Sequence, residues 1–257
     1  MPGELRSPEK EKHEKQQTRI PRTLGVGELE WPRKLFHSSI GPIAIALYIS
    51  QVSMTYILRL LTLTLLVILV IDLFRLRSTS IGRGRFASAY ESVVGTLMRE
   101  SERQKLNSTI WYLLGAIISV ASFKRDVAIA SISILALADT SASTFGRVFG
   151  KYTSKLPSPP FGEKKSIAGF LAAFAAGSFV SWLIWGWNVV NGSSIAEAGR
   201  LSTDTLSWYA SGKITLPLLM LGVGAISAVT ESLDVHGLDD NLTLPVISGL
   251  LITLLLK

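Results

Sequence analysis

The chain has no cysteine, which excludes disulfide scaffolds, thiolate metal sites and thiol nucleophiles. Charged residues are also scarce, at 18% of 257 residues, against about a quarter in a typical soluble domain. No cleavable signal peptide is recognisable, because the first 37 residues are polar, so we expect the first apolar span to act as the insertion signal. No internal repeat is visible. These features argue against a soluble or disulfide-stapled protein.

Long apolar runs are what the sequence does contain, with 48% apolar residues and a mean hydropathy of +0.38. Seven stretches are long enough, or nearly so, to cross a bilayer at about 1.5 Å per helical residue. They are 38–58, 60–74, 106–123, 127–146, 166–196, 214–230 and 241–256. The sequence therefore predicts an all-α, polytopic integral membrane bundle of about seven transmembrane helices over residues 31–257. Residues 1–30 mix charged and small polar residues, which predicts a disordered cytosolic tail.

The basic residues predict the orientation. If the N-terminus is cytosolic, the cytosolic segments 1–37, 75–105, 140–165 and 231–240 hold 20 of the 26 lysines and arginines. This asymmetry is the positive-inside pattern of a multi-pass protein with a cytosolic N-terminus. The net charge of +7 is then explained by topology and by contact with lipid headgroups, and no nucleic-acid partner is expected.

Asp139 lies within an apolar span, where an ionisable side chain is costly and is a functional candidate by default. On a helix, Asp139, Ser143 and Arg147 share one face, which offers a carboxylate for a divalent metal and a guanidinium for a phosphate. The alternative is that the small residues around them only allow close helix packing, which does not require the aspartate. Asp72 has a similar location, but Arg75 is three residues away and can pair with it.

Two glycines and a lysine follow Asp139. Gly146 and Gly150 are spaced unlike those of a Walker A loop, and we expect them to end a helix and let backbone amides approach an anion. Lys165 and Ser166 stand at the start of the fifth span, where a helix N-terminus predicts a phosphate site. The alternative is an ordinary lysine at the membrane border.

The same predicted face carries further charges. Arg33 and Lys34 precede the first span and are candidates for phosphate contact. Segment 231–241 has four carboxylates and no lysine or arginine, which predicts a divalent cation site, with a solvated loop as the alternative. Its carboxylates are Glu231, Asp234, Asp239 and Asp240. Cations for phosphates, carboxylates for a metal and apolar helices for a lipid together indicate phosphoryl transfer at a membrane surface.

Four blocks of this sequence resemble the CTP-dependent lipid kinases, the group that contains dolichol kinase, phytol kinase and fungal diacylglycerol kinase and is related to the CDP-diacylglycerol synthases. The blocks are RKLFHSSIG (33–41), ALADTSASTFGRVFGK (136–151), KKSIAGFLAAF (164–174) and SLDVHGLDDNLTLPVIS (232–248). The resemblance covers nearly the whole membrane region and is strongest to the fungal CTP-dependent diacylglycerol kinases.

The resemblance implies transfer of the γ-phosphoryl group of CTP to diacylglycerol, giving phosphatidate and CDP, with a divalent cation (Mg²⁺ or Ca²⁺). It also implies residence in the endoplasmic reticulum and nuclear membranes. The family's basic pair falls on Arg33 and Lys34, its aspartate on Asp139 and its glycine on Gly146. The residue before the aspartate, often serine in the family, is Ala138 here.

We therefore predict the following site. The catalytic residues are Asp139, Arg33, Lys34, Asp234, Asp239 and Asp240; the nucleotide phosphates contact Gly146, Arg147, Gly150, Lys165 and Ser166; and the metal ligands come from Asp139, Glu231, Asp234 and Asp240. Asp139 either holds the metal or accepts the lipid hydroxyl proton. The expected partners are diacylglycerol, CTP and membrane lipids, and protein partners are not predicted.

Three alternatives remain open from the sequence. The first is a dolichol, polyprenol or phytol kinase. The second is a cytidylyltransferase that forms a CDP-lipid. The third is a transporter or scaffold in which Asp139 serves ion coupling. The third would be expected to show broken spans in paired halves, which the sequence does not display.

Overall fold

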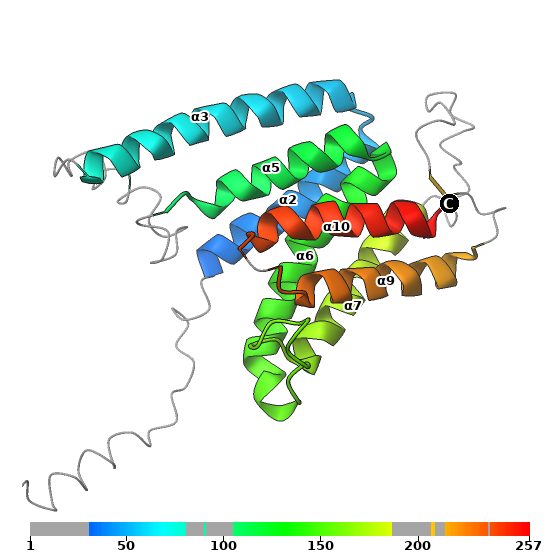
Figure 1. Ribbon diagram of the computed structural model, residues 1–257. Coiled ribbons are helices and arrows are strands. Elements are labelled where there is room, and N and C mark those ends of the chain that lie inside the picture. The colour runs from blue at the N-terminus through cyan, green and yellow to red at the C-terminus, as the bar shows by residue number, and fades with distance from the viewer. Residues whose placement is uncertain (1–30, 81–89, 91–104, 187–206, 209–213, 236) are drawn as a thin grey trace, which may run out of the picture. The chain divides into compact units, whose positions relative to one another are not determined.

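The computed structural model describes residues 31–80, 90, 105–186, 207–208, 214–235 and 237–257. These residues form seven α-helices, two short helical turns and two isolated β-bridges, and no strand. The helices are α2 (Trp31–Ile49), α3 (Met54–Ser80), α5 (Ser108–Ser122), α6 (Arg125–Phe149), α7 (Ile167–Ser181), α9 (Leu216–Ser232) and α10 (Asp240–Leu255). The all-α prediction is confirmed for this part of the chain (Figure 1). The predicted tail, residues 1–30, lies outside the described residues.

A helix occupies each of the seven predicted spans, but their lengths differ. Within the described part of the chain, three helical segments are long and apolar enough to cross a membrane, namely 54–77, 125–152 and 167–186, while α5, α9 and α10 are shorter apolar helices. The third segment includes the π-helical turn η5 (Trp182–Gly186) at the end of α7. The expected span 166–196 extends beyond Gly186 into residues outside the described part. The count of seven crossings therefore stays a prediction.

The border between the first two spans was placed wrongly at Arg59. In the structure α2 ends at Ile49, a turn that includes Gln51 at φ 57° follows, and α3 begins at Met54. Arg59 lies inside α3 with an exposed side chain. A long arginine can keep its charge in water while its stem lies along an apolar helix, so a lone charge does not mark a helix end.

The core is centred on α6, whose residues from Asp126 to Ala136 are all buried. This helix packs mainly against α7 and α10, and α7 packs against α9. The α7–α9 contact depends on small residues, because a Cβ on Gly177 would lie 2.3 Å from Ser227 Cβ and a Cβ on Gly224 would lie 2.3 Å from Ser178 Oγ. Small residues thus bring these helices together, as is usual between membrane helices.

One end of these helices gathers most of the predicted site residues, and we call it the charged end. There α2, α5, α7 and α10 begin and α3, α6 and α9 end. The connection from α6 to α7 begins with the 3₁₀ turn η4 (Gly150–Tyr152) and docks on the end of α9. Gly162 N donates to Ser232 O at 3.0 Å, and Asp234 N donates to Pro160 O at 3.2 Å. This connection, residues 150–166, therefore forms a fixed rim at the charged end.

Candidate functional site

The last turns of α6 line a cavity of about 310 Å³ at the charged end. Asp139, Ser143 and Arg147 all face it, as their helical spacing predicts. The opposite wall comes from the start of α7, the end of α9 and the start of α10, through Lys164, Lys165, Ser166, Glu231 and Asp240. We call this space the Asp139 cavity. It combines three basic side chains with three carboxylates, which suits an anionic ligand bound together with a cation.

Lys165 and Glu231 form the best-defined pair in this cavity. Lys165 Nζ lies 2.7 Å from Glu231 Oε1 and also donates to the Glu231 carbonyl oxygen at 2.7 Å. The Glu231 side chain is 4% exposed and that of Lys165 is 27% exposed. Burial lowers the pKa of Lys165, but the Glu231 carboxylate outweighs this and raises the pKa above its ordinary value. The pair therefore presents a fixed ammonium to the cavity.

The sequence predicts Glu231 as a metal ligand, whereas in the structure its partner is Lys165. Its Oε1 accepts from Lys165, and its Oε2 lies 3.4 Å from the Ser232 hydroxyl, which donates to it. A lysine close to a carboxylate competes with a cation for the same oxygen. In this arrangement Glu231 positions Lys165. Among the described residues, no lysine lies at hydrogen-bond distance from the cavity's other carboxylates, Asp139 and Asp240.

Ser166 caps α7 instead of leaving its amides open. Its Oγ accepts from Gly169 N at 3.3 Å. The two preceding amides also have protein acceptors: Ile167 N donates to Ser154 O at 3.0 Å and Ala168 N to Thr153 Oγ1 at 3.3 Å. The start of α7 thus contributes its dipole but not the N–H groups that a phosphate would need. The cationic groups that line this cavity are instead the side chains of Arg147, Lys164 and Lys165.

Gly146 and Gly150 make room for this cap. A Cβ on Gly150 would lie 3.0 Å from Ser166 Oγ, and one on Gly146 would lie 3.5 Å from it. Gly146 also lines the Asp139 cavity, whereas Gly150 does not. Both glycines therefore allow the connection to return tightly against the start of α7. The predicted contact of the Gly150 amide with an anion is not supported, because Gly150 does not line this cavity.

A second cavity of about 620 Å³ adjoins the first and shares Lys164, Lys165 and Asp240 with it. Its remaining walls come from the rim and from the segment after α9: Ser158, Pro159, Pro160, Phe161, Gly162, Glu163, Leu233 and Asp234. We call it the rim cavity. It offers an aromatic ring, a proline wall and two acidic side chains next to the charged cavity.

The acidic segment after α9 divides its carboxylates between different tasks. Asp234 is exposed and lines the rim cavity. Asp239 is the N-cap of α10, and its Oδ1 accepts from Asn241 N at 2.9 Å and from Asn241 Nδ2 at 2.8 Å. Asp239 lines neither the Asp139 cavity nor the rim cavity. Its sequence position is therefore accounted for by helix capping.

Arg33 and Lys34 point to different surroundings, because neighbours on a helix are about 100° apart. Lys34 is 4% exposed, and its Nζ donates to Thr144 Oγ1 of α6 at 3.1 Å. One turn further, the Ser38 hydroxyl donates to Thr140 Oγ1 at 3.0 Å. The polar stripe of α6 next to the Asp139 stripe thus packs against α2. Arg33 instead faces a third cavity.

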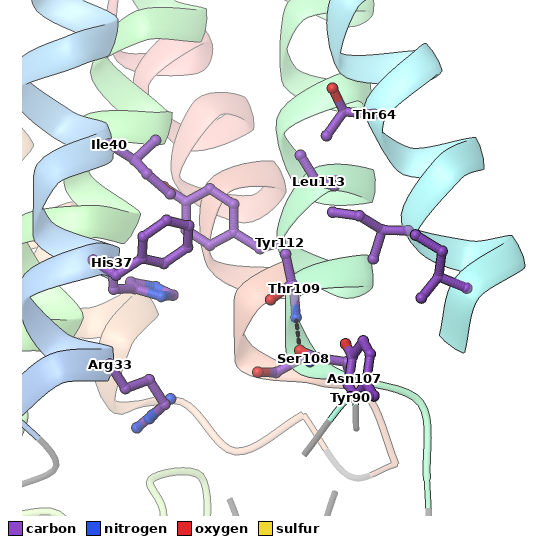
Figure 2. Close-up of a pocket in the computed structure, with 13 residues that line it drawn as sticks. Arg33, His37, Ile40, Thr64, Tyr90, Asn107, Ser108, Thr109, Tyr112 and Leu113 are labelled. Atoms are coloured by element: carbon purple, nitrogen blue, oxygen red, sulfur yellow. Dashed lines mark hydrogen bonds between the residues drawn. The ribbon is translucent and has the colours of Figure 1, made fainter. Parts of the chain in front are cut away.

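This third cavity, of about 370 Å³, lies between α2, α3 and α5. Figure 2 shows Arg33 and His37 on α2 facing Ser108, Thr109 and Tyr112 on α5. The His37 and Tyr112 rings meet edge to face with centroids 4.6 Å apart. Apolar side chains dominate the remaining lining, namely Phe36, Ile40, Ile68, Ile71 and Leu113. We call it the α2–α3–α5 cavity.

The predicted divalent cation would need ligands from the carboxylates of the Asp139 cavity. No group of three His, Cys, Asp or Glu side chains that could hold a metal occurs among the described residues. Asp139 and Asp240 nevertheless line one cavity together with basic side chains. Mg²⁺ in phosphoryl-transfer sites is usually held by one or two carboxylates plus the substrate phosphates, so this donor set fits the cation without a complete protein cage.

Two other buried aspartates are explained by the fold. Asp72 Oδ1 lies 2.7 Å from Arg75 Nε, and its Oδ2 accepts from Asn107 N at 2.9 Å, so the alternative reading of Asp72 as Arg75's partner is confirmed. Asp126, at the other end of α6, accepts from Trp185 Nε1 at 2.9 Å and from the Ser207 hydroxyl at 2.9 Å. Neither lines any of the three cavities described above.

Comparison with known proteins places this chain in a family. A CTP-dependent diacylglycerol kinase 1 of Saccharomyces cerevisiae is 34% identical over 228 residues, which cover 89% of this chain and 74% of that protein. One of Schizosaccharomyces pombe is 35% identical over 88% of this chain and 94% of that protein. One of Eremothecium gossypii is 34% identical over 86% of this chain and 65% of that protein. The chain belongs to the CTP-dependent diacylglycerol kinase family. No family profile and no solved structure matches it.

Within this family assignment, sequence reasoning missed two features of the site. The pairing of Lys165 with Glu231 joins residues 66 positions apart, and nothing in either local pattern indicates it. The α2–α3–α5 cavity was also missed, because its lining alternates with side chains that are exposed on the same helices. One partial signal for this cavity is present in the sequence, because the polar residues His37 and Ser38 stand at the start of an apolar span.

Proposed function

We propose that this protein is a CTP-dependent diacylglycerol kinase that transfers the γ-phosphoryl group of CTP to the hydroxyl of diacylglycerol, giving phosphatidate and CDP. The family of the chain supports the reaction. The observation that carries the site is the Asp139 cavity, where Arg147, Lys164 and Lys165 surround Asp139 and Asp240 at one end of an apolar helix bundle. Such a site can neutralise a triphosphate and hold a carboxylate beside it.

The reaction then follows from the charges of the cavity. The lipid hydroxyl oxygen forms a bond to the γ-phosphorus, and the bond from that phosphorus to the β–γ bridging oxygen breaks, with its electron pair leaving on CDP. The hydroxyl proton passes to a carboxylate, which we assign to Asp139, with Asp240 beside it in the same cavity. Arg147 and Lys165 stabilise the negative charge on the transferring group and on CDP.

A divalent cation is the second part of the proposal. When bound, it would neutralise part of the negative charge on the CTP phosphates. Asp240 would hold it, because among the described carboxylates of this cavity it is the one that neither pairs with Lys165 nor is assigned the lipid proton. Mg²⁺ and Ca²⁺ both accept such oxygen ligands.

The rim cavity is where we place the nucleoside of CTP. It adjoins the Asp139 cavity through Lys164, Lys165 and Asp240, so a triphosphate in one leaves the base in the other. Phe161 offers a ring on which a base can stack. Glu163 and Asp234 offer carboxylates, and a carboxylate can accept from the cytosine amino group.

The membrane arrangement is proposed from the charge pattern. We infer seven crossings, the charged end in the cytosol, and residence in the endoplasmic reticulum and nuclear membranes. Because the chain has no cysteine, single cysteines report sidedness directly. Lys155→Cys, exposed on the rim, should react with an impermeant maleimide on intact microsomes, and Lys124→Cys, at the start of α6, only after permeabilisation. The reverse pattern would overturn the orientation.

One assay tests the reaction. Purified protein in mixed micelles receives γ-labelled CTP or ATP with either diacylglycerol or dolichol. Labelled phosphatidate from CTP and diacylglycerol alone is the expected result. Labelled dolichyl phosphate would move the function to a polyprenol kinase. Release of pyrophosphate with a CDP-lipid product would make the protein a cytidylyltransferase.

A further inference from the structure

The α2–α3–α5 cavity is an apolar space with one polar end. Its apolar part is lined by Ile40, Ile68, Ile71 and Leu113. At the other end Arg33 of α2 lies across the cavity from Asn107, Ser108 and Tyr90, as Figure 2 shows. Its volume of about 370 Å³ falls within the range of ligand-binding pockets, roughly 300–1,000 Å³. Such a lining suits a ligand with a long apolar part and a small polar head.

The position of α3 indicates where such a molecule comes from. Among the helix pairs with substantial contact in the described residues, α3 packs against α5 alone, and it lies beside α5 in Figure 1. Its outward side chains are apolar and largely exposed, with Leu63 at 61% and Val70 at 65% exposure. In a bilayer this surface faces lipid, so the cavity behind α3 is separated from the acyl chains by one loosely attached helix.

The polar end of the cavity lies beside the phosphoryl-transfer site. Arg33 precedes Lys34, which donates to Thr144 of α6, and Thr144 lies one turn before Arg147 of the Asp139 cavity. Likewise His37 precedes Ser38, which donates to Thr140, the residue after Asp139. The contact between α2 and α6 is thus a shared wall, with Arg33 and His37 on one side and Asp139 and Arg147 on the other.

We propose that the α2–α3–α5 cavity binds an acyl chain of diacylglycerol, with the glycerol end at Arg33 and Asn107. This rests on the proposed function and adds to it the place where the lipid is held. The free hydroxyl then reaches the charged end next to the wall formed by Lys34 and Thr144. A phosphatidylcholine headgroup fits this end less well, because its choline cation would lie beside the Arg33 guanidinium.

The test uses two variants on one helix. Ile68→Trp fills the cavity, whereas Leu66→Trp adds the same ring at an exposed position of α3. We expect Ile68→Trp to raise the KM for diacylglycerol in mixed micelles by about tenfold or more, with the KM for CTP unchanged. Leu66→Trp should match the wild type in both. Equal KM values for diacylglycerol in the two variants would overturn the proposal.

A labelling measurement does not depend on either variant folding or on turnover. Wild-type protein in micelles, without CTP, is irradiated with a diacylglycerol that carries a diazirine on one acyl chain. We expect labelled peptides from residues 64–71 and 109–113, and suppression by excess diacylglycerol but not by phosphatidylcholine. Labelling spread over the lipid-facing surface, or suppressed equally by both lipids, contradicts a specific site.

The two proposals can fail separately. Specific labelling of this cavity in a protein that transfers no phosphoryl group to diacylglycerol would leave a neutral-lipid site and remove the proposed reaction. Normal transfer to diacylglycerol, with labelling elsewhere, would keep the reaction and remove the cavity from it.

Discussion

Lys165 Nζ lies 2.7 Å from both the Oε1 and the backbone oxygen of Glu231, at the junction of the Asp139 cavity and the rim cavity. Two opposing effects act on this ammonium. Burial lowers the pKa of Lys165, and the carboxylate raises it, with a net rise above the ordinary value of 10.5. The ion pair therefore keeps a positive charge in a place where burial alone would weaken it.

The first prediction concerns the pH dependence of Glu231→Gln. Lys165 supplies its charge below its pKa and loses it as the pH rises through that pKa. Without this carboxylate burial still lowers the pKa of Lys165, while only the weaker attractions of Asp240 and Asp139 raise it, so the pKa is lower than in the wild type and the charge is lost at lower pH. We expect kcat/KM for CTP to decline at a lower alkaline pH in Glu231→Gln than in the wild type. Lys155→Gln, on the exposed rim, serves as the control, and coincident alkaline limbs for Glu231→Gln and wild type would contradict this role.

The second prediction concerns Asp139→Asn. The amide keeps the shape of the side chain but can neither accept a proton nor carry a negative charge. We expect kcat to fall by about 10²–10⁴-fold, as for loss of a general base, with an unchanged melting temperature in detergent. The measurement is CTP-dependent phosphatidate formation per folded molecule. Normal turnover in this variant would remove Asp139 from the reaction.

The third prediction separates capping from catalysis at Asp239. Asparagine caps a helix about as well as aspartate, whereas alanine loses the cap at a cost of about 1 kcal/mol. Since Asp239 Oδ1 accepts from the start of α10, Asp239→Asn should keep both stability and kcat. Asp239→Ala should lower the melting temperature and keep kcat for the folded fraction. A large loss of kcat in Asp239→Asn would instead return this carboxylate to the active site.

The sequence predicted the site best where it depends on a single helix. The co-facial placement of Asp139, Ser143 and Arg147 needs only the helical period, and the structure brings all three to one cavity. The gathering of charged segments at one end also followed from the basic residues, because membrane helices must alternate in direction. The side of the membrane on which this end lies stays a prediction.

What the sequence could not provide depends on contacts between distant segments. The α7 N-terminus reads as a phosphate site, but the rim supplies acceptors to its amides from Ser154 and Thr153. The sequence predicts Asp239 as a catalytic carboxylate, but in the structure its oxygen caps α10. Glu231 is predicted as a metal ligand, but in the structure it pairs with Lys165. In each case the local sequence is compatible with two roles, and the hydrogen-bond partner in the folded structure decides between them.

The fourth prediction tests the rim cavity. If the cytosine ring stacks on Phe161, the variant Phe161→Leu loses about 1–3 kcal/mol of nucleotide binding, or roughly a 5- to 150-fold rise in KM for CTP. The KM for diacylglycerol should stay unchanged. Tyr152→Leu is the matched control, because Tyr152 is 75% exposed at the start of the same connection and lines neither cavity. Equal KM values for CTP in both variants would place the base elsewhere.

The fifth prediction concerns Asp126, a fully buried carboxylate at the end of α6 remote from Asp139. The two are 13 residues apart, which is about 20 Å along a helix. Asp126 accepts from the buried Trp185 Nε1 and from the half-buried Ser207 N, at 2.6 Å, and Ser207 hydroxyl, so Asp126→Ala takes the acceptor away from all three donors. Each such donor costs about 1–3 kcal/mol.

We therefore expect Asp126→Ala to lower the melting temperature in detergent by roughly 5–15 °C, at a few degrees per kcal/mol. Asp234→Ala, an exposed carboxylate, should leave the melting temperature near that of the wild type. Below its own melting temperature Asp126→Ala should keep the wild-type KM for CTP, because the Asp139 cavity and the rim cavity, where we propose that CTP binds, are at the opposite end of α6. A variant that kept its stability and lost turnover would show that Asp126 acts in function, since a purely structural carboxylate affects activity only through the folded fraction.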